Sequence, residues 1–183
     1  MPEVKEAQIV LHDDVPMVTI TREFDAPPES VFRAHTDPEL FAQWIGPEYL
    51  ANTIDRWECR DGGEWRYVSR HDGEEYWFRG CFHEVRPSEV IVQTFAFEGF
   101  PDSVSLERLE LTDLGNGRTR LTATSLVDSF ESRDVVTGQA EHYANLADQF
   151  GLRVTPHHVS ICCGDRREFA RSTTSSGLPA NAV

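Results

Sequence analysis

Apolar and polar residues alternate with a period of two along much of the chain between Met17 and Ser125. This period is typical of half-buried β-strands. The alternating segments are MVTITREF (17–24), EWRYVSR (64–70), EEYWFRGCFHEV (74–85), VIVQTFAF (90–97) and RTRLTATSL (118–126). ANTIDRWEC (51–59) and SVSLERLELTDL (103–114) are further strand candidates. Turn dipeptides in HDG (71–73) and GNG (115–117) favour hairpins between them. The pattern predicts an antiparallel sheet of about six to seven strands.

The segment 103–114 breaks its own alternation. Val104 and Leu106 have one parity, whereas Leu109 and Leu111 have the other. One extra residue in a strand would bring both pairs to the same face. We therefore predict a β-bulge near Glu107–Arg108.

Two short helices are predicted directly after the first strand. The turn at 25–30 can lead into a helix that begins at Pro28 or Glu29. Asp37 can cap a second helix that has Pro38 at its first position. Gly46–Pro47 would end that helix.

The second helix carries an aromatic cluster. Leu40, Phe41 and Trp44 stand at positions i, i+1 and i+4, so they share one helical face.

A long helix is predicted after the last strand, because the apolar period changes to that of a helix with one apolar face. The positions on this face are Val135, Val136, Gln139, His142, Tyr143, Leu146, Ala147 and Phe150. Strands are thus segregated from helices along the chain, which is typical of an α+β domain.

Three parts of the chain differ in pattern. Residues 1–16 have no clear period and are expected to form a loose N-terminal arm. Residues 17–150 form the predicted domain. Residues 151–183 lack a sustained period and end in Ser, Thr, Gly, Pro and Ala, so we expect an atypical, flexible C-terminal tail.

The net charge of −14 changes the range of possible partners. Such a surface repels phosphate backbones and anionic membranes, so we expect neither nucleic-acid binding nor membrane binding. No run approaches the roughly 18 apolar residues that span a bilayer, and the N-terminus does not resemble a signal peptide. We therefore expect a cytoplasmic protein whose cysteines are free thiols.

Motifs for nucleotide, zinc-protease and serine-hydrolase chemistry are missing from the sequence, so no cofactor is expected. His157, His158, Cys162 and Cys163 are residue types that suit zinc. Their side-by-side spacing does not, and we expect no metal site.

One long segment and three shorter ones carry a family resemblance. They are ITREFDAPPESVFRAHTDPELFAQWIGP (20–47), RDGGEWRYV (60–68), FRGCFHEVRPSEVIVQTF (78–95) and GNGRTRLTATS (115–125). Together they resemble START-like (SRPBCC, helix-grip) proteins over about residues 17–150. Within that superfamily they are most similar to the subfamily named for the C-terminal domain of the activator of the heat-shock ATPase chaperone.

This resemblance implies a curved antiparallel sheet that grips the long C-terminal helix, with an apolar cavity between them. The two small helices would close one end, with Trp44 in a lid at the cavity mouth. The chain departs from the family at Ile45, where many relatives have a second tryptophan. Gly151 and Pro156 also shorten the last helix.

The candidate ligand-binding residues are those whose parity or helical face points into this cavity. They are Phe41, Trp44, Trp65, Tyr67, Phe78, Phe82, Ile91, Gln93, Phe95, Phe97, Leu109, Leu111, Leu121, Gln139, Tyr143 and Leu146. An aromatic concavity with a few polar groups is typical of small-molecule sites. The alternative is that the same side chains simply fill the core.

Gln93 is the most informative of these residues, because it lies within an apolar strand on the parity of Ile91 and Phe95. A buried amide without partners costs about 1–3 kcal/mol, so it must bond to a ligand, water or another side chain.

The sequence predicts a protein that binds a small apolar or amphipathic molecule for sequestration or delivery. A protein–protein module of the chaperone-accessory type is the second hypothesis. A cyclase- or dehydratase-like enzyme is the third, with His83, Glu84 and His142 as possible acid–base groups. His83 has outward parity and no pair of inward carboxylates is evident, so we expect no catalytic residues. The pattern does not distinguish a monomer from a homodimer.

Overall fold

The computed structural model describes residues 7–136. Its helices are α1 (Pro28–Thr36), α2 (Pro38–Trp44) and α3 (Phe130–Val136). Its strands are β1 (Gln8–Leu11), β2 (Met17–Phe24), β3 (Ala51–Trp57), β4 (Glu64–His71), β5 (Glu74–Arg86), β6 (Val90–Phe97), β7 (Ser105–Gly115) and β8 (Arg118–Leu126).

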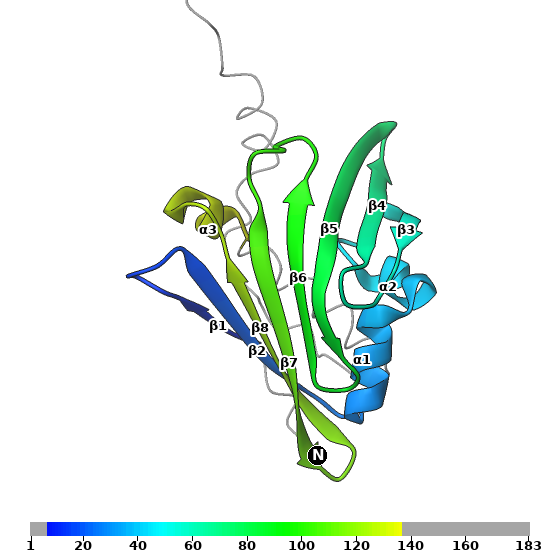
Figure 1. The fold of residues 1–183 in the computed structure, drawn as a ribbon, viewed down its shortest axis with the longest axis vertical. Coiled ribbons are helices and arrows are strands. Elements are labelled where there is room, and N and C mark those ends of the chain that lie inside the picture. The colour runs from blue at the N-terminus through cyan, green and yellow to red at the C-terminus, as the bar shows by residue number, and fades with distance from the viewer. Residues whose placement is uncertain (1–6, 137–183) are drawn as a thin grey trace, which may run out of the picture.

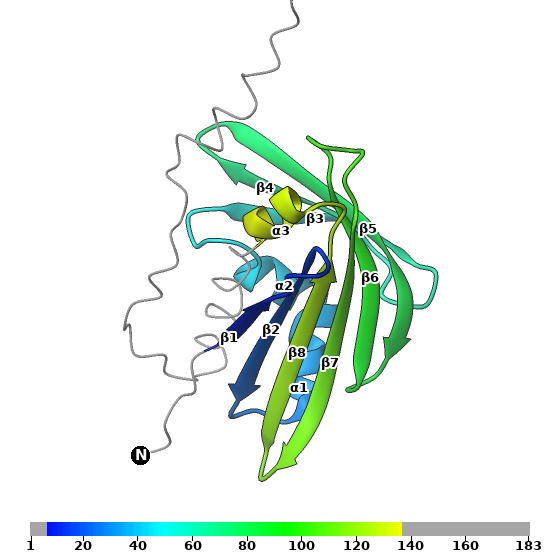
Figure 2. The same ribbon diagram turned by 90° about the vertical axis from the view of Figure 1, so that its left-hand side faces the viewer.

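The strands form one antiparallel sheet in the order β1-β2-β8-β7-β6-β5-β4-β3 (Figure 1). Sequence neighbours pair along most of the sheet, while β8 returns to pair with β2. The sheet is curved, and α1 and α2 lie on its concave side (Figure 2). There α1 contacts β7 and β8, and α2 contacts β3. The predicted α+β helix-grip class is confirmed.

The eighth strand comes from the predicted loose arm. Gln8–Leu11 pairs antiparallel with β2, and Ile9 lies opposite Ile20. Ile9 also packs against the core. The expected loose arm therefore contains a paired strand, which the sequence pattern did not reveal because four residues are too few to show a period.

The predicted bulge near Glu107–Arg108 is absent from the described sheet. β7 pairs with β6 without interruption from Ser105 to Glu110, and with β8 from Leu106 to Asp113. β7 keeps its regular alternation of inward and outward side chains, but Leu106 and Glu107 lie on the faces opposite to those predicted. Leu106 faces outward and is 45% exposed, whereas Glu107 faces inward and is 8% exposed.

Register shifts occur instead in three other places. They lie between Ile54 and Arg56, between Phe82 and Glu84, and between Asp113 and Gly115. Two of them are on β3 and β5, in the half of the sheet that curves over α2 (Figure 2). Bulges increase local twist and bend, which suits this curvature.

The predicted helix signals are confirmed. The Asp37 side chain accepts hydrogen bonds from the backbone N–H of Glu39 at 3.0 Å and of Leu40 at 3.3 Å. Helix α2 ends at Trp44, and Gly46 follows with φ of +79°, a conformation that glycine adopts without strain.

The last helix begins at Phe130, where the hydroxyl of Ser129 accepts from the backbone N–H of Ser132 at 3.0 Å. α3 is described from Phe130 to Val136. The predicted continuation, with Gln139, His142, Tyr143 and Leu146, lies outside the described residues, as do Gly151, Pro156, the tail and the His157–Cys163 segment.

Candidate functional site

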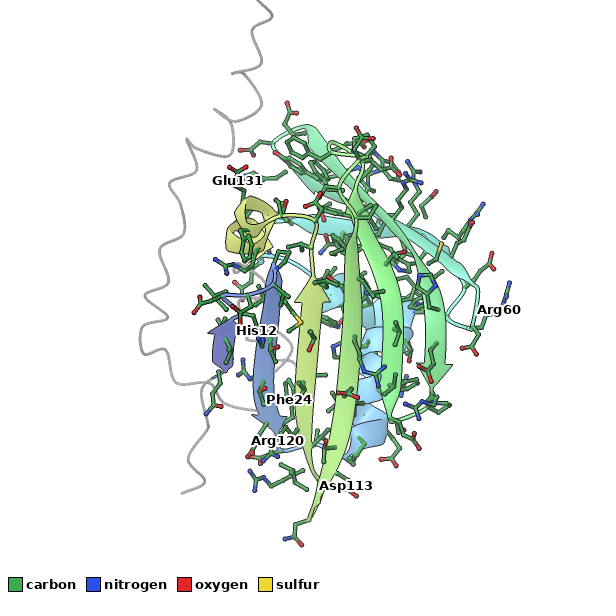
Figure 3. All side chains as sticks on the ribbon, turned by 60° about the vertical axis from the view of Figure 1, so that its left-hand side comes forward. His12, Phe24, Arg60, Asp113, Arg120 and Glu131 are labelled. Atoms are coloured by element: carbon green, nitrogen blue, oxygen red, sulfur yellow. The ribbon has the colours of Figure 1, made fainter. Side chains whose placement is uncertain are left out.

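The concave face of β4, β5 and β6 is lined by aromatic rings. Tyr67 stacks between Trp65 and Phe78, with ring centroids 5.7 Å and 5.0 Å away. Phe95 continues the surface at 5.3 Å from Trp65 and 5.5 Å from Phe78. These four rings and Phe82 are defined here as the aromatic wall. By contrast, charged groups such as Arg60 and Asp113 project from hairpins at the sheet ends (Figure 3).

The predicted inward residues within the described range do face the interior. Those that are buried are Phe41, Trp44, Trp65, Tyr67, Phe82, Ile91, Leu109 and Leu121. Those that are partly buried are Phe78, Gln93, Phe95, Phe97 and Leu111. Their contact with a ligand stays a prediction.

Gln93 finds its partner on the neighbouring strand. Its Nε2 donates to Oε2 of Glu107 at 3.0 Å, and the two residues are opposite each other in the β6–β7 register. Glu107 was not predicted to face inward, because the expected bulge would have changed the face on which it lies. Counting back from Leu109 and Leu111 without a bulge would have placed Glu107 inside.

Glu107 also affects the aromatic wall electrostatically. Burial raises the pKa of Tyr67, and the negative charge of Glu107 raises it further. Tyr67 is therefore a neutral hydroxyl at any physiological pH, able to donate or accept a hydrogen bond.

Trp65 carries a donor that no described residue satisfies. The side chain is 2% exposed, and its indole Nε1 has no hydrogen-bond partner among residues 7–136. Its ring lies over Gly80, opposite it in the β4–β5 register. A Cβ on Gly80 would approach Cζ2 at 2.5 Å and Cε2 at 2.6 Å. Because Cε2 is bonded to Nε1, the donor edge of the indole leans toward β5.

The indole N–H groups of the two neighbouring tryptophans do have hydrogen-bond partners. Nε1 of Trp44 donates to the carbonyl of Ala34 at 2.8 Å, and Nε1 of Trp57 donates to that of Thr36 at 2.7 Å. These carbonyls belong to the last turn of α1, which lacks intrahelical partners. Trp44 is 3% exposed and joins α2 to α1. It therefore packs in the core of the described part, and its role as a lid over a ligand stays a prediction.

His35 lines a narrow gap under α1. Its Nδ1–H donates to the carbonyl of Val31 at 2.8 Å, and burial lowers its pKa to about 4. The gap is too narrow to hold a water molecule, whereas typical ligand pockets measure roughly 300–1,000 Å³. Its lining consists of Phe32, His35, Val90, Ile91, Leu109, Leu111 and Leu121.

A second inward charge is Arg22, which is 5% exposed and shares the parity of Ile20 and Phe24 on β2. Its guanidinium lies 5.6 Å from the centroid of the Phe24 ring. The alternation of β2 could have identified it, since one parity of an alternating strand faces the core.

The proposed acid–base groups do not join the concave site. His83 is exposed, and Glu84 lies on the outer surface, 2.9 Å from Arg86. His142 lies outside the described residues. Within 7–136, no group of three or more His, Cys, Asp or Glu residues could hold a metal.

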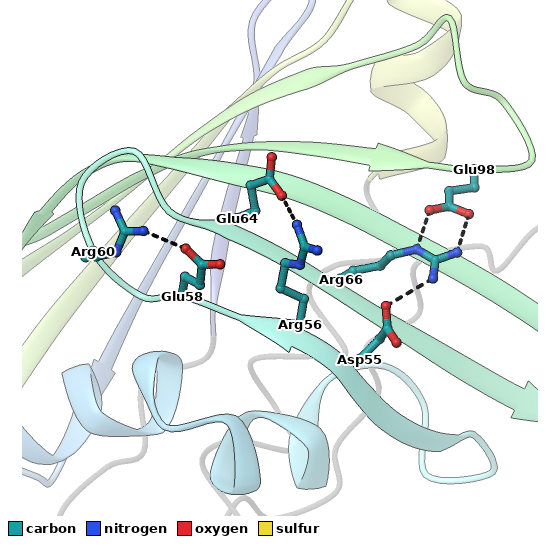
Figure 4. A network of polar contacts seen from close by, with 7 residues as sticks. All are labelled: Asp55, Arg56, Glu58, Arg60, Glu64, Arg66 and Glu98. Carbon is teal, nitrogen blue, oxygen red and sulfur yellow. Dashed lines mark hydrogen bonds and ion pairs between the residues drawn. The ribbon is translucent and has the colours of Figure 1, made fainter.

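The convex side of β3 and β4 carries an ion-pair network (Figure 4). Arg66 donates to both carboxylate oxygens of Glu98 at 2.7 Å and 2.9 Å, and to Asp55 at 3.1 Å. Its guanidinium also lies 3.9 Å above the Trp77 ring. The hydrogen bond from Arg66 is the main cause that holds the pKa of Glu98 below its ordinary value. This network joins strands and does not reach the concave face.

Comparisons with known proteins agree with this architecture. Residues 25–151 match the family described as "Activator of Hsp90 ATPase homolog 1-like protein". No curated protein matches the chain. Within the described residues, no helix is long and apolar enough to cross a membrane.

Solved structures from several bacteria are similar. A crystal structure from Rhodobacter sphaeroides has 24% identity and a TM-score of 0.70, covering 80% of this chain and 98% of that one. Protein Ms6760 from Mycobacterium smegmatis has 25% identity and a TM-score of 0.66, with coverages of 81% and 98%. Protein CV1439 from Chromobacterium violaceum has 25% identity and a TM-score of 0.65, with coverages of 73% and 96%.

Proposed function

Because this chain belongs to the Activator of Hsp90 ATPase homolog 1-like family, whose fold serves ligand-binding or chaperone-accessory modules, we propose that it binds a small apolar or amphipathic molecule. The ligand would lie against the aromatic wall on the concave face of the sheet. Its role would be sequestration or delivery of that molecule.

The observation that carries this proposal is the buried indole N–H of Trp65 within the aromatic wall. A buried donor without a partner costs about 1–3 kcal/mol, so such groups often mark a place where another molecule bonds. Gln93 and Glu107 add polar groups at the edge of the same apolar surface. An apolar concavity with a few convergent polar groups is the usual form of a small-molecule site.

The aromatic wall also supplies the driving force. Removing apolar area from water contributes about 25 cal/mol per Å², before the costs of association. Flat ring faces favour ligands with rings or long apolar chains.

Native mass spectrometry of the freshly purified full chain tests this proposal. We expect an added mass that disappears under denaturing conditions, and a thermal shift with members of a lipid and aromatic library. Phe95→Ala should weaken binding because it removes part of the aromatic wall. Phe100→Ala, which removes a ring that is 47% exposed, is the matched control. Empty protein with no thermal shift across the library would contradict the proposal.

A second candidate function is supported by an exposed apolar strip on the convex face. Leu106 and Leu126 are opposite each other on β7 and β8, and Val104 stands two residues before Leu106. Their exposed fractions of 45%, 42% and 46% suit contact with a protein partner. If the chain activates a chaperone ATPase of the family's namesake type, Leu106→Glu should abolish the stimulation. Val10→Glu, at another exposed site, should not change it.

A further inference from the structure

Three polar groups border the aromatic wall on the inward faces of β4, β6 and β7. Trp65 is paired with Gly80, while Gln93 is paired with Phe82 on β5 and with Glu107 on β7. Gly80 and Phe82 are successive inward positions of β5. Two interstrand spacings of about 4.8 Å separate β4 from β6, a distance that a tryptophan and a glutamine side chain can span between them.

The hydrogen-bonding capacity of these groups is specific. Trp65 offers a donor, and that donor has no partner in the described part of the chain. Gln93 uses its Nε2 on Glu107, while its Oε1 makes no hydrogen bond to any residue of 7–136. The corner therefore holds a buried donor on β4 and an acceptor atom on β6, and the carboxylate of Glu107 is bonded to the same amide as that acceptor.

We propose that this corner selects neutral ligands that carry a hydroxyl group on a flat apolar body. This inference rests on the proposed function. A hydroxyl is the small group that both accepts and donates. It would accept from the indole N–H of Trp65 and donate to Oε1 of Gln93. The ring or chain that bears it would lie on the aromatic wall.

The negative charge of Glu107 should weaken the binding of acidic ligands. A carboxylate ligand would bring a second negative charge beside a carboxyl group that is 8% exposed, where water screens little. Like charges in such a place repel strongly. An ether would satisfy Trp65 but leave Oε1 of Gln93 without a donor. Neutral hydroxyl compounds are therefore preferred over both.

Binding of three naphthalene probes to the full chain tests this inference at pH 7. Isothermal titration calorimetry would compare 1-naphthol, 1-methoxynaphthalene and 1-naphthoate. We expect 1-naphthol to bind about tenfold more tightly than the ether, the difference expected for one hydrogen bond. We expect 1-naphthoate to bind more weakly than either.

One spectroscopic readout and two mutational readouts test the proposed contacts. The indole N–H resonance of Trp65, assigned with Trp65→Phe, should move on addition of 1-naphthol. Gln93→Leu should remove the advantage of naphthol over the ether. Glu107→Gln should raise the affinity for 1-naphthoate. Glu110→Gln, an exposed acid on the outward side of the same strand, is the matched control and should change neither.

The outcomes separate the two proposals. Equal binding of naphthol and the ether, unchanged in Gln93→Leu, would overturn the hydroxyl preference and leave apolar binding intact. Tightest binding of 1-naphthoate would also overturn it and indicate Arg22 as the polar anchor. Lack of binding by all three probes would count against the proposed function together with this inference.

Discussion

The indole N–H of Trp44 donates to the main-chain carbonyl of Ala34, ten residues earlier, at 2.8 Å. This bond fixes α2 against the end of α1. The Trp44 ring also makes edge contacts with His35 and Phe41, with centroids 4.9 Å and 5.2 Å away. The aromatic cluster of α2 therefore anchors one helix on another.

Trp44→Phe should lower the free energy of unfolding by about 1–3 kcal/mol, because it leaves a buried carbonyl without its donor while keeping an aromatic ring. Urea denaturation followed by circular dichroism measures this change. Gln43→Ala, on the exposed side of the same helix, should cost much less. Equal effects of the two substitutions would show that the bond contributes little.

Removal of the Asn52 side chain should also destabilise the C-terminal end of α2. Its Nδ2 donates to the carbonyls of Ile45 at 2.6 Å and Ala42 at 3.2 Å, and its Oδ1 accepts from Ser69 at 2.6 Å. We expect Asn52→Ala to cost about 1–3 kcal/mol and Ser69→Ala less, since it removes one of the three bonds. The reverse order in urea denaturation would argue against this account.

The free energy of unfolding should decrease as the pH is lowered, because His35 is buried as a neutral ring. Its pKa is about 4 in the folded protein, below the ordinary value of 6.5. The unfolded chain therefore binds a proton first, so stability is full above about pH 6.5 and declines toward pH 4. The loss reaches roughly 3 kcal/mol.

Carboxylates titrate in the same range, so a variant must isolate the His35 contribution. His35→Asn keeps a donor for the Val31 carbonyl and removes the titration. The difference in unfolding free energy between wild type and His35→Asn should change between pH 7.5 and pH 4. A constant difference, or a His35 pKa near 6.5 by NMR, would refute the prediction.

Gly80→Ala should destabilise the sheet, because the new Cβ would collide with the Trp65 ring and the backbone carbonyl of Thr94. A backbone atom cannot yield as a flexible side chain can, so we expect a loss of about 1–3 kcal/mol. Arg79→Ala, on the exposed side of the same strand, is the control. A melting temperature unchanged from wild type would show that Trp65 and β6 adjust freely.

The sequence predicted the fold well where the pattern was long and regular. The alternation of β4, β5 and β6 identified Trp65, Phe82 and Gln93 as inward-facing. Capping chemistry placed α2, because Asp37 and Gly46 act through the backbone of their own neighbours. Local rules of this kind need no knowledge of distant residues.

The predictions failed where local pattern was short or ambiguous. β1 has four residues, and its pairing with β2 gives it structure. The change of apolar parity within β7 was interpreted as a bulge, although cross-strand pairing keeps the register and exposes Leu106 instead. That error concealed Glu107, the partner of Gln93.

The sequence by itself determined the order of strands and helices from β2 onward and the aromatic character of the concave face, because both follow from side-chain type and spacing. Its motifs also identified the family by resemblance. Tertiary structure decided which polar atoms meet. Nε1 of Trp44 finds Ala34 on another helix, while Nε1 of Trp65, in an equally apolar setting, finds no described partner. Such pairing depends on how the helices and strands pack against one another, and no local pattern encodes it.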